Sequence, residues 1–276
     1  MSPSLRPCVF AALFVVLVVP GQALANENAA PSAEEEAPVL PILVLQIGAG
    51  ARFRNINLDL GDGAGGTETR SFETGAYFDF AWHLLVRPMG RRVSKPSVQA
   101  IVLQVDGALG IGLKAEISGI ELQTNSWRML GQFGYLYPMD RLELGGLVGV
   151  GADVFDIDPN FVLPSSRIIY ARFGPALSYQ IVPRFLRFRA DFGLRFPFYL
   201  GRLEDAFGNE SSGIGLDAAL TFQGWLHVGF SYAVRFVWEY YRLRFSGSNM
   251  NVPAMGDGGD GNDHALTIQF LFGWSL

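Results

Sequence analysis

The side chains that could do chemistry in this chain are few, and their spacing supports no catalytic site. The three histidines, His83, His227 and His264, are its only imidazole bases. A base must lie within hydrogen-bond reach of a nucleophile to activate it. No spacing in the sequence pairs one of these histidines with a serine such as Ser211 or Ser212. We therefore expect that the protein is not an enzyme.

An acidic, glycine-rich stretch near the C-terminus is the one candidate metal site. The segment "GGDGNDHA" at residues 258–265 matches most of a calcium-binding nonapeptide, with Asp263 in the ligand position. That motif works as a stack of repeats, whereas this chain has a single copy in which Ala265 replaces the large apolar residue. A flexible acidic loop is therefore favoured, and Asp257, Asp260 and Asp263 are at most weak ligands. We expect neither a bound metal ion nor a cofactor.

The first 25 residues, 1–25, have the composition of a cleaved secretory signal peptide. Arg6 supplies a positive start, and Cys8–Val19 form an apolar run that is shorter than the ~20 residues of a membrane-spanning helix. Residues 26–42 are acidic and without periodicity, which predicts a flexible periplasmic tail. Cleavage would remove the only cysteine, and the acidic balance of the remainder argues against a nucleic-acid partner.

The rest of the chain, residues 43–276, alternates large apolar residues with small or polar ones. In "LRFRADFGLRFPF" at 186–198, leucine and phenylalanine share one parity, while arginine, Asp191 and Gly193 share the other. A period of two is typical of a β-strand with two unlike faces. The alternation predicts ten strands, near residues 43–54, 71–87, 99–113, 126–137, 141–155, 167–181, 185–200, 214–223, 227–244 and 265–276.

The first of these strands loses its alternation near its end. After Arg54, the apolar residues Ile56, Leu58 and Leu60 fall on the opposite parity from the apolar residues before them. A β-bulge or the end of the strand would explain the change.

Short connections alternate with long ones along the chain. The tripeptides "PMD" and "VPR" follow the fourth and sixth strands, while "GRLEDAFGNESSG" and "SGSNMNVPAMGDGGDGND" follow the seventh and ninth. In these features the sequence resembles the bacterial outer-membrane β-barrel proteins, which have short periplasmic turns, long outer loops, an apolar outside and a polar inside. The resemblance implies an all-β fold, a transmembrane antiparallel up-and-down barrel of about ten strands. It also implies a porin-like protein of the Gram-negative outer membrane, with both termini in the periplasm.

The last strand, "ALTIQFLFGWSL", is similar to the signal that the barrel-assembly machinery of these bacteria reads. The matching positions are Phe270, Phe272, Trp274 and Leu276. The resemblance therefore implies this machinery as a partner during biogenesis, and outer-membrane lipid and lipopolysaccharide as the surroundings of the finished barrel. No extracellular ligand can be named from the sequence.

Parity assigns the remaining candidate residues to the two faces of the wall. Aromatic residues near strand ends on the apolar face predict girdles at the two membrane interfaces: Trp82, Trp127, Tyr135, Tyr137, Tyr179, Trp238 and Tyr240. The opposite face supplies a lumen charge network of Arg52, Arg54, Glu73, Asp79, Asp106, Arg128, Glu143, Asp153, Arg172, Arg187, Arg189, Asp191, Arg195, Asp217, Arg235 and Glu239.

The functional expectation follows from the width of such a barrel. Barrels of about eight strands are filled by their own side chains, whereas those of 16 to 18 strands are open. We expect a narrow or occluded charged lumen, with a structural or interaction role through the extracellular loops. A narrow pore for passive diffusion of small solutes is the alternative. A surface hydrolase, similar to the omptin proteases or to lipid A-modifying enzymes, is a third hypothesis.

Overall fold

The computed structural model describes most of the chain from residue 40 onward. The described residues are 40–61, 66–89, 96–111, 114–117, 120–157, 164–182, 185–208, 210–227, 229–246 and 258–276. They all belong to one compact unit, Ala37–Leu276. The predicted signal peptide and nearly all of the predicted tail lie outside them and stay predictions. No helix formed by the described residues is long and apolar enough to cross a bilayer.

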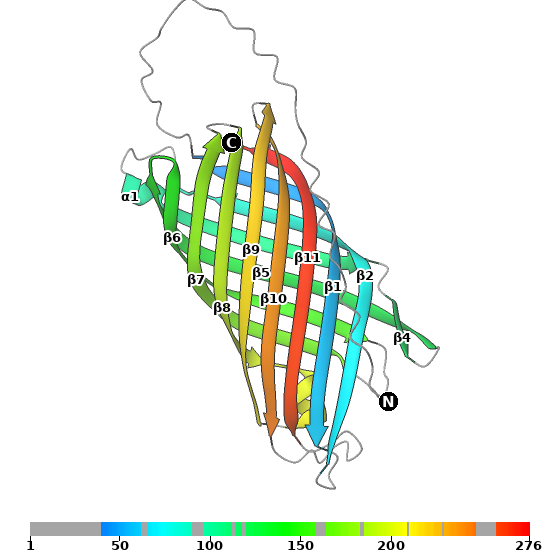
Figure 1. Ribbon diagram of the computed structural model, residues 1–276. Coiled ribbons are helices and arrows are strands. Elements are labelled where there is room, and N and C mark those ends of the chain that lie inside the picture. The colour runs from blue at the N-terminus through cyan, green and yellow to red at the C-terminus, as the bar shows by residue number, and fades with distance from the viewer. Residues whose placement is uncertain are drawn as a thin grey trace, which may run out of the picture. The chain divides into compact units, whose positions relative to one another are not determined.

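Within this part of the chain, ten strands pair into one closed antiparallel ring (Figure 1). β1 (Leu43–Gly61) pairs with β2 (Thr67–Val86) on one side and with β11 (Gly259–Ser275) on the other. The expected barrel is therefore confirmed. The ring continues in chain order through β3 (Ile101–Ile111), β5 (Ile120–Met139), β6 (Leu142–Ile157), β7 (Ser166–Val182), β8 (Leu186–Tyr199), β9 (Glu210–His227) and β10 (Phe230–Ser246).

Three short elements accompany the ring. β4 (Lys114–Ile117) pairs with the start of β5, and Figure 1 shows it projecting beyond the barrel wall. α1 (Pro96–Gln99) lies at the end of the barrel where the short turns are, which we call the short-turn end. α2 (Arg202–Phe207) lies at the opposite, long-loop end, within the connection from β8 to β9.

The two chain-terminal strands seal the wall. The backbone N–H of Leu276 donates to the carbonyl of Leu43 at 2.8 Å, and the N–H of Leu43 donates back to Leu276 at 3.2 Å. The side chains of Phe270, Phe272, Trp274 and Leu276 all point outward and are more than half exposed. Pairing β11 with β1 therefore leaves no free sheet edge at the terminus and gives the lipid an apolar surface.

A bulge in β2 corrects one assignment made from parity. Arg52 pairs with Tyr77 but Arg54 pairs with Thr74, so β2 carries an extra residue there. The extra residue reverses the parity of β2 before the bulge. Phe72 is therefore buried inside the barrel, and Glu73 is exposed on the outside. The prediction that Glu73 belongs to the lumen network is wrong.

The change of pattern in β1 has another cause than the one expected. β1 continues unbroken to Gly61, and its alternation of buried and outward positions is maintained. Ile56, Leu58 and Leu60 lie inside the barrel, almost completely buried. The strand does not end after Arg54. Instead, the kind of residue that points inward changes from polar to apolar.

The same inversion of polarity occurs on the neighbouring strands β10 and β11 and divides this part of the wall into two zones. On β11, apolar outward side chains extend from Trp274 to Leu266, and His264 follows them. This stretch of about ten residues spans roughly 25 Å at ~3.3 Å per residue and a tilt of about 40°, which is the height of the apolar band of membrane barrels. Beyond His264, the outward residues of β11 are Asn262 and Asp260.

We call the part of the barrel beyond the level of His264 the extension. Most of its outward residues are polar, with Phe198 and Ile214 as apolar exceptions, and most of its inward residues are apolar and tightly packed. The outward set includes Asn55, Asn57, Asp59, Arg242, Arg244, Asp260 and Asn262. The inward set, the apolar plug, contains Ile56, Leu58, Leu60, Phe72, Phe155, Ile157, Ile168, Leu243 and Phe245, together with Leu200, Leu203, Ala206 and Phe207 from α2 and its approach. The extension therefore has the polarity of a water-soluble barrel, with α2 packed into its core.

A new outward charge should destabilise the barrel much more in the lipid-facing zone than in the extension. Phe192 faces outward near the middle of β8, so Phe192→Arg should lower the free energy of unfolding by about 2–4 kcal/mol. Asn125→Arg, which places the same charge outward in the extension opposite Asp156, should change it by under about 0.5 kcal/mol. Denaturant unfolding in lipid vesicles measures both. Equal costs for the two variants would contradict the assignment of zones.

Truncating a side chain of the plug should leave a cavity and lower stability, in the part of β1 where the sequence indicated a β-bulge or the end of the strand. Leu58 has no exposed surface, so Leu58→Ala should lower the free energy of unfolding by about 2–5 kcal/mol. Leu45→Ala on the same strand removes an outward, half-exposed side chain and should cost clearly less. If Leu58→Ala were tolerated as well as Leu45→Ala in the same unfolding assay, the plug would not be a packed core.

Candidate functional site: the charged lumen

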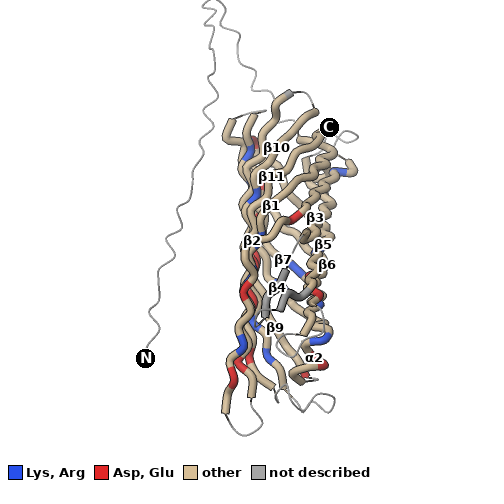
Figure 2. The backbone as a smooth tube through the Cα atoms, turned by 90° about the vertical axis from the view of Figure 1, so that its right-hand side faces the viewer, with Lys and Arg blue, Asp and Glu red and all other residues tan. Residues whose placement is uncertain are grey.

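Ion pairs occupy the lumen of the membrane zone. Figure 2 shows that basic and acidic residues occur at several heights along the strands. Every residue predicted for the network except Glu73 lies on an inward position. Two further members, Asp263 and Arg87, were not predicted as lumen residues. The network has a central layer near the middle of the barrel and a second cluster near the short-turn end, which we call the mouth.

Glu239 of β10 is the hub of the central layer. Its carboxylate accepts Arg128 at 2.9 Å, Arg52 at 3.2 Å and Arg195 at 2.8 Å. β5 and β10 lie on opposite sides of the ten-strand ring, so the pair between Arg128 and Glu239 crosses the lumen. Arg128 also donates to Asp79 of β2 at 2.8 Å. A carboxylate with three guanidinium partners ties four strands together.

A second part of the central layer joins β1 to β6 and β11. Asp153 accepts Arg52 at 2.9 Å and Arg54 at 3.4 Å. Arg54 also forms a two-bond contact with Asp263, at 2.5 and 3.0 Å. Asp263 is therefore a buried ion-pair partner. The glycine-rich segment around Asp263 predicts a loop. The signal that places Asp263 in the lumen is that it has the same parity as Thr267 on β11.

The third part of the central layer lies between β7, β8 and β9. Asp217 accepts Arg172 at 2.7 Å and Arg195 at 2.7 Å. Gly193 on β8 makes this contact possible, because a Cβ there would overlap the Arg172 guanidinium and the Asp217 carboxylate. Arg195 also donates to the Tyr241 hydroxyl at 2.7 Å. Planar guanidinium groups suit this enclosed packing because they make several directed hydrogen bonds at once.

The charges of the central layer balance. Its guanidinium groups belong to Arg52, Arg54, Arg128, Arg172 and Arg195, and its carboxylates to Asp79, Asp153, Asp217, Glu239 and Asp263. The two sets are equal in number. Removing one partner from such a buried set leaves an uncompensated charge, which is far costlier than losing a surface pair.

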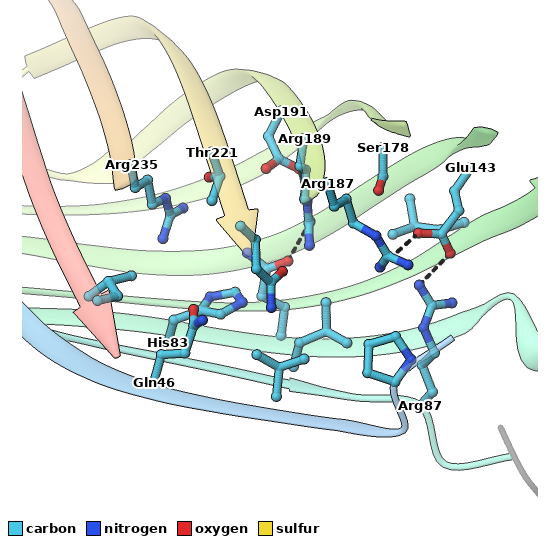
Figure 3. A pocket seen from close by; sticks show the side chains of 17 residues that line it. Gln46, His83, Arg87, Glu143, Ser178, Arg187, Arg189, Asp191, Thr221 and Arg235 are labelled. Carbon is cyan, nitrogen blue, oxygen red and sulfur yellow. Dashed lines mark hydrogen bonds and ion pairs between the residues drawn. The ribbon is translucent and has the colours of Figure 1, made fainter. Parts of the chain in front are cut away.

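The mouth contains a looser set of side chains, shown in Figure 3. Glu143 accepts Arg87 at 2.5 Å and Arg187 at 3.5 Å. Asp191 accepts Arg189 at 2.9 Å. Arg87 immediately follows the last residue of β2 and shares the parity of Asp79 and His83. It lies within the strand predicted over 71–87, so parity was a signal that could have identified it.

Asp106 of β3 completes the mouth on its inner side. Its carboxylate pairs with the guanidinium of Arg235 and lies 2.7 Å from Nδ1 of His83. Gln104 donates to the same carboxylate at 2.6 Å and accepts Arg189 at 2.6 Å. The mouth is thus a connected polar cluster, but with fewer carboxylates than guanidinium groups.

Among the described lumen residues, two small cavities can be located in this packing. One, of about 30 Å³, lies in the mouth and is lined by charged residues including Arg87, Glu143, Arg187 and Arg189. The other, of about 50 Å³, lies against the central layer beside Arg128, Arg195 and Glu239. Arg235 lines both. A water molecule needs about 10–15 Å³ of such volume, so each cavity has room for a few waters or one small ion.

The candidate ligands of the acidic C-terminal segment do not converge. Asp260 faces outward and pairs with the exposed Arg244 at 3.2 Å, whereas Asp263 faces the lumen. Asp257 lies outside the described residues. No group of three or more metal-ligating side chains occurs in the part of the chain that the structure describes.

The residues predicted for the aromatic girdles all occupy outward positions in the structure. Tyr135, Tyr137 and Tyr179 lie near the short-turn end, where the rings of Tyr135 and Tyr137 are 6.4 Å apart. Trp238 stacks on Tyr240 at 6.2 Å. Tyr240 packs against His264 at 4.6 Å, at the level where the wall changes polarity. Trp82 and Trp127 also face outward, from β2 and β5.

Comparison with known proteins gives only a weak likeness in fold. The sequence matches no protein-family model and no curated protein sequence. An outer membrane channel from Pseudomonas putida aligns with a TM-score of 0.42 at 10% identity, over 88% of this chain and 100% of that one. The outer membrane protein OprG of Pseudomonas aeruginosa aligns with a TM-score of 0.33 at 10% identity, over 83% of this chain and 96% of that one. A FadL homologue from the same bacterium aligns with a TM-score of 0.32 at 9% identity, over 84% and 90%.

At these scores the likeness carries no argument about function. The class of the protein follows from its own structure. In a closed antiparallel ring, the backbone N–H and C=O groups of every wall strand are hydrogen-bonded without water. The middle zone presents apolar and aromatic residues outward, and the interior is charged. The chain is a bacterial outer-membrane β-barrel.

Proposed function

We propose that this barrel is closed in its resting state and that it has a structural or interaction role at the cell surface, exerted through its long-loop end. The observation that carries the proposal is the filled lumen. Ion pairs such as Arg128 with Glu239 cross the membrane zone, and the apolar plug fills the extension beyond it. In an open conduit, the path of a solute would contain neither ion pairs that cross the lumen nor an apolar plug.

The extension is the part of the barrel best suited to meet other molecules. It carries the wall roughly 15 Å beyond the apolar band, by the rise and tilt of its last six or so residues. Its outward surface is polar and holds charges of both signs, including Asp59, Arg244 and Asp260. We place this end outside the cell and both termini in the periplasm, because long loops of such barrels face outward. Lipopolysaccharide would then surround the base of the extension.

A narrow pore is the second candidate, and one observation favours it. The two cavities share Arg235 as a lining residue, so small polar spaces extend from the mouth to the central layer. A solute on that path would still meet the plug, where Phe155 and Phe207 are completely buried. The pore hypothesis therefore requires the plug to move.

A surface hydrolase has less support from the described residues. The His264 ring packs on Tyr240 and points outward. The hydroxyl of Ser211, near the start of β9, donates to the carboxylate of Glu204 in α2 at 2.6 Å. Among the described residues no serine hydroxyl is hydrogen-bonded to a histidine ring, and a nucleophile needs such a base.

Conductance in planar bilayers separates the first two candidates. The wild-type barrel should show no steady single-channel current. The double variant Phe155→Ala with Phe207→Ala, which removes two plug rings, should also show none, because the ion pairs still cross the lumen. Steady currents in the wild type would contradict the proposal. Currents that appear only in the double variant would favour the gated pore.

The structural role of the network predicts a large stability effect at its hub. Glu239→Gln leaves Arg52, Arg128 and Arg195 without a shared carboxylate, and should lower the free energy of unfolding by about 3–5 kcal/mol. The control Asp260→Asn removes one partner of an exposed pair and should cost less than about 1 kcal/mol. Denaturant unfolding in vesicles measures both. A cost for Glu239→Gln as small as that of the control would show that the lumen charges do not hold the barrel together.

A further inference from the structure

The charges of the mouth do not balance, in contrast to those of the central layer. Its carboxylates belong to Asp106, Glu143 and Asp191, and its guanidinium groups to Arg87, Arg187, Arg189 and Arg235. One positive charge is therefore in excess among the described residues. The excess is located at Glu143, because this single carboxylate serves both Arg87 and Arg187.

The same side chains also leave buried hydrogen-bond donors without acceptors. The Nε–H groups of Arg87 and Arg187, and the side-chain amide nitrogen of Gln223, are buried and have no partner. The side chains of Arg87 and Arg187 are 1% and 7% exposed. Leaving a buried donor unsatisfied costs free energy, and the cost is larger for a charged group.

These groups surround one space. Arg87, Arg187, Arg189 and Gln223 all line the cavity of about 30 Å³ in the mouth. Figure 3 shows Arg187 of β8 and Arg87, which follows β2, reaching Glu143 from different sides, with Arg189 beside them. The space is lined by side chains, is partly open, and lies at the short-turn end of the lumen, where Pro41 precedes β1.

We propose that the mouth binds one small monovalent anion, of the chloride class, between Arg87, Arg187 and Arg189. A single negative charge cancels the single positive excess, and a compact anion accepts the donors that the protein leaves unpaired. The cavity has room for an ion of one heavy atom or a few atoms. A water molecule would fill the space without balancing the charge. This inference concerns the mouth alone and does not depend on whether the lumen conducts.

Thermal unfolding of the folded full-length mature protein in detergent tests the proposal. The probe is sodium chloride titrated against sodium gluconate at constant ionic strength, because gluconate is too large for the cavity. Binding to the folded state alone raises the unfolding temperature as the anion concentration passes its dissociation constant. We expect a saturable rise with chloride. The same unfolding temperature in both salts would overturn the proposal.

Two substitutions should move the chloride dependence in opposite directions. Arg187→Gln removes the excess charge, and should raise the half-saturating chloride concentration by about tenfold or more, the loss expected for one charged hydrogen-bond partner. Glu143→Gln increases the excess and should lower that concentration. Arg244→Gln, which removes an exposed guanidinium of the extension, is the matched control and should leave it unchanged. A purely structural role for these residues would not produce shifts of opposite sign.

A direct measurement covers the case in which a mouth variant does not fold. Crystals of the wild-type protein grown in sodium bromide should show an anomalous scattering peak between Arg87, Arg187 and Arg189. A chloride-dependent rise in stability without this peak would place the anion elsewhere, and would overturn the assignment to the mouth.

Discussion

The absence of water inside a bilayer is the constraint on which this structure depends. Backbone N–H and C=O groups in lipid must be paired within the protein, so the wall has to close on itself. β1 and β11 meet that demand through hydrogen bonds that reach Leu43 and Leu276 at the chain's end. Once the ring is closed, each residue points either to lipid or to the lumen. The polarity of both faces follows from that division.

A ring of ten strands encloses a narrow space, and this makes the lumen charges depend on one another. Side chains as long as arginine reach across it, as Arg128 does to Glu239. A narrow lumen can hold such charges only when they are paired, because burying an isolated charge is very costly. The central layer meets this requirement and the mouth does not quite meet it. The apolar plug has a different role, because it gives the extension, whose outward face is mostly polar, a hydrophobic core of its own.

Alternation in the sequence was enough to predict the ring, the number of its strands and nearly all of its lumen charges, because parity alone determines the face. It could not locate Glu73, because the extra residue in β2 leaves no mark in composition. It did not place Leu58 inside the barrel, because the apolar residues of β1 change parity after Arg54. The structure shows that the strand geometry is unchanged there and that the inward face becomes apolar. Asp263 was read as part of a loop because glycines surround it. Which charges pair, and that the mouth retains one in excess, depend on distances between strands far apart in the chain.

The central claim is that the wall inverts its polarity at the level of Tyr240 and His264, so that the barrel is a membrane protein below this level and resembles a soluble one above it. Spin labels placed at outward positions of β10 test this most directly, by their relaxation with oxygen, which concentrates in lipid, and with a water-soluble nickel chelate. Labels at 234, 236 and 238 should respond to oxygen, and labels at 242, 244 and 246 should respond to nickel. An oxygen response that continued through 246 would contradict the account.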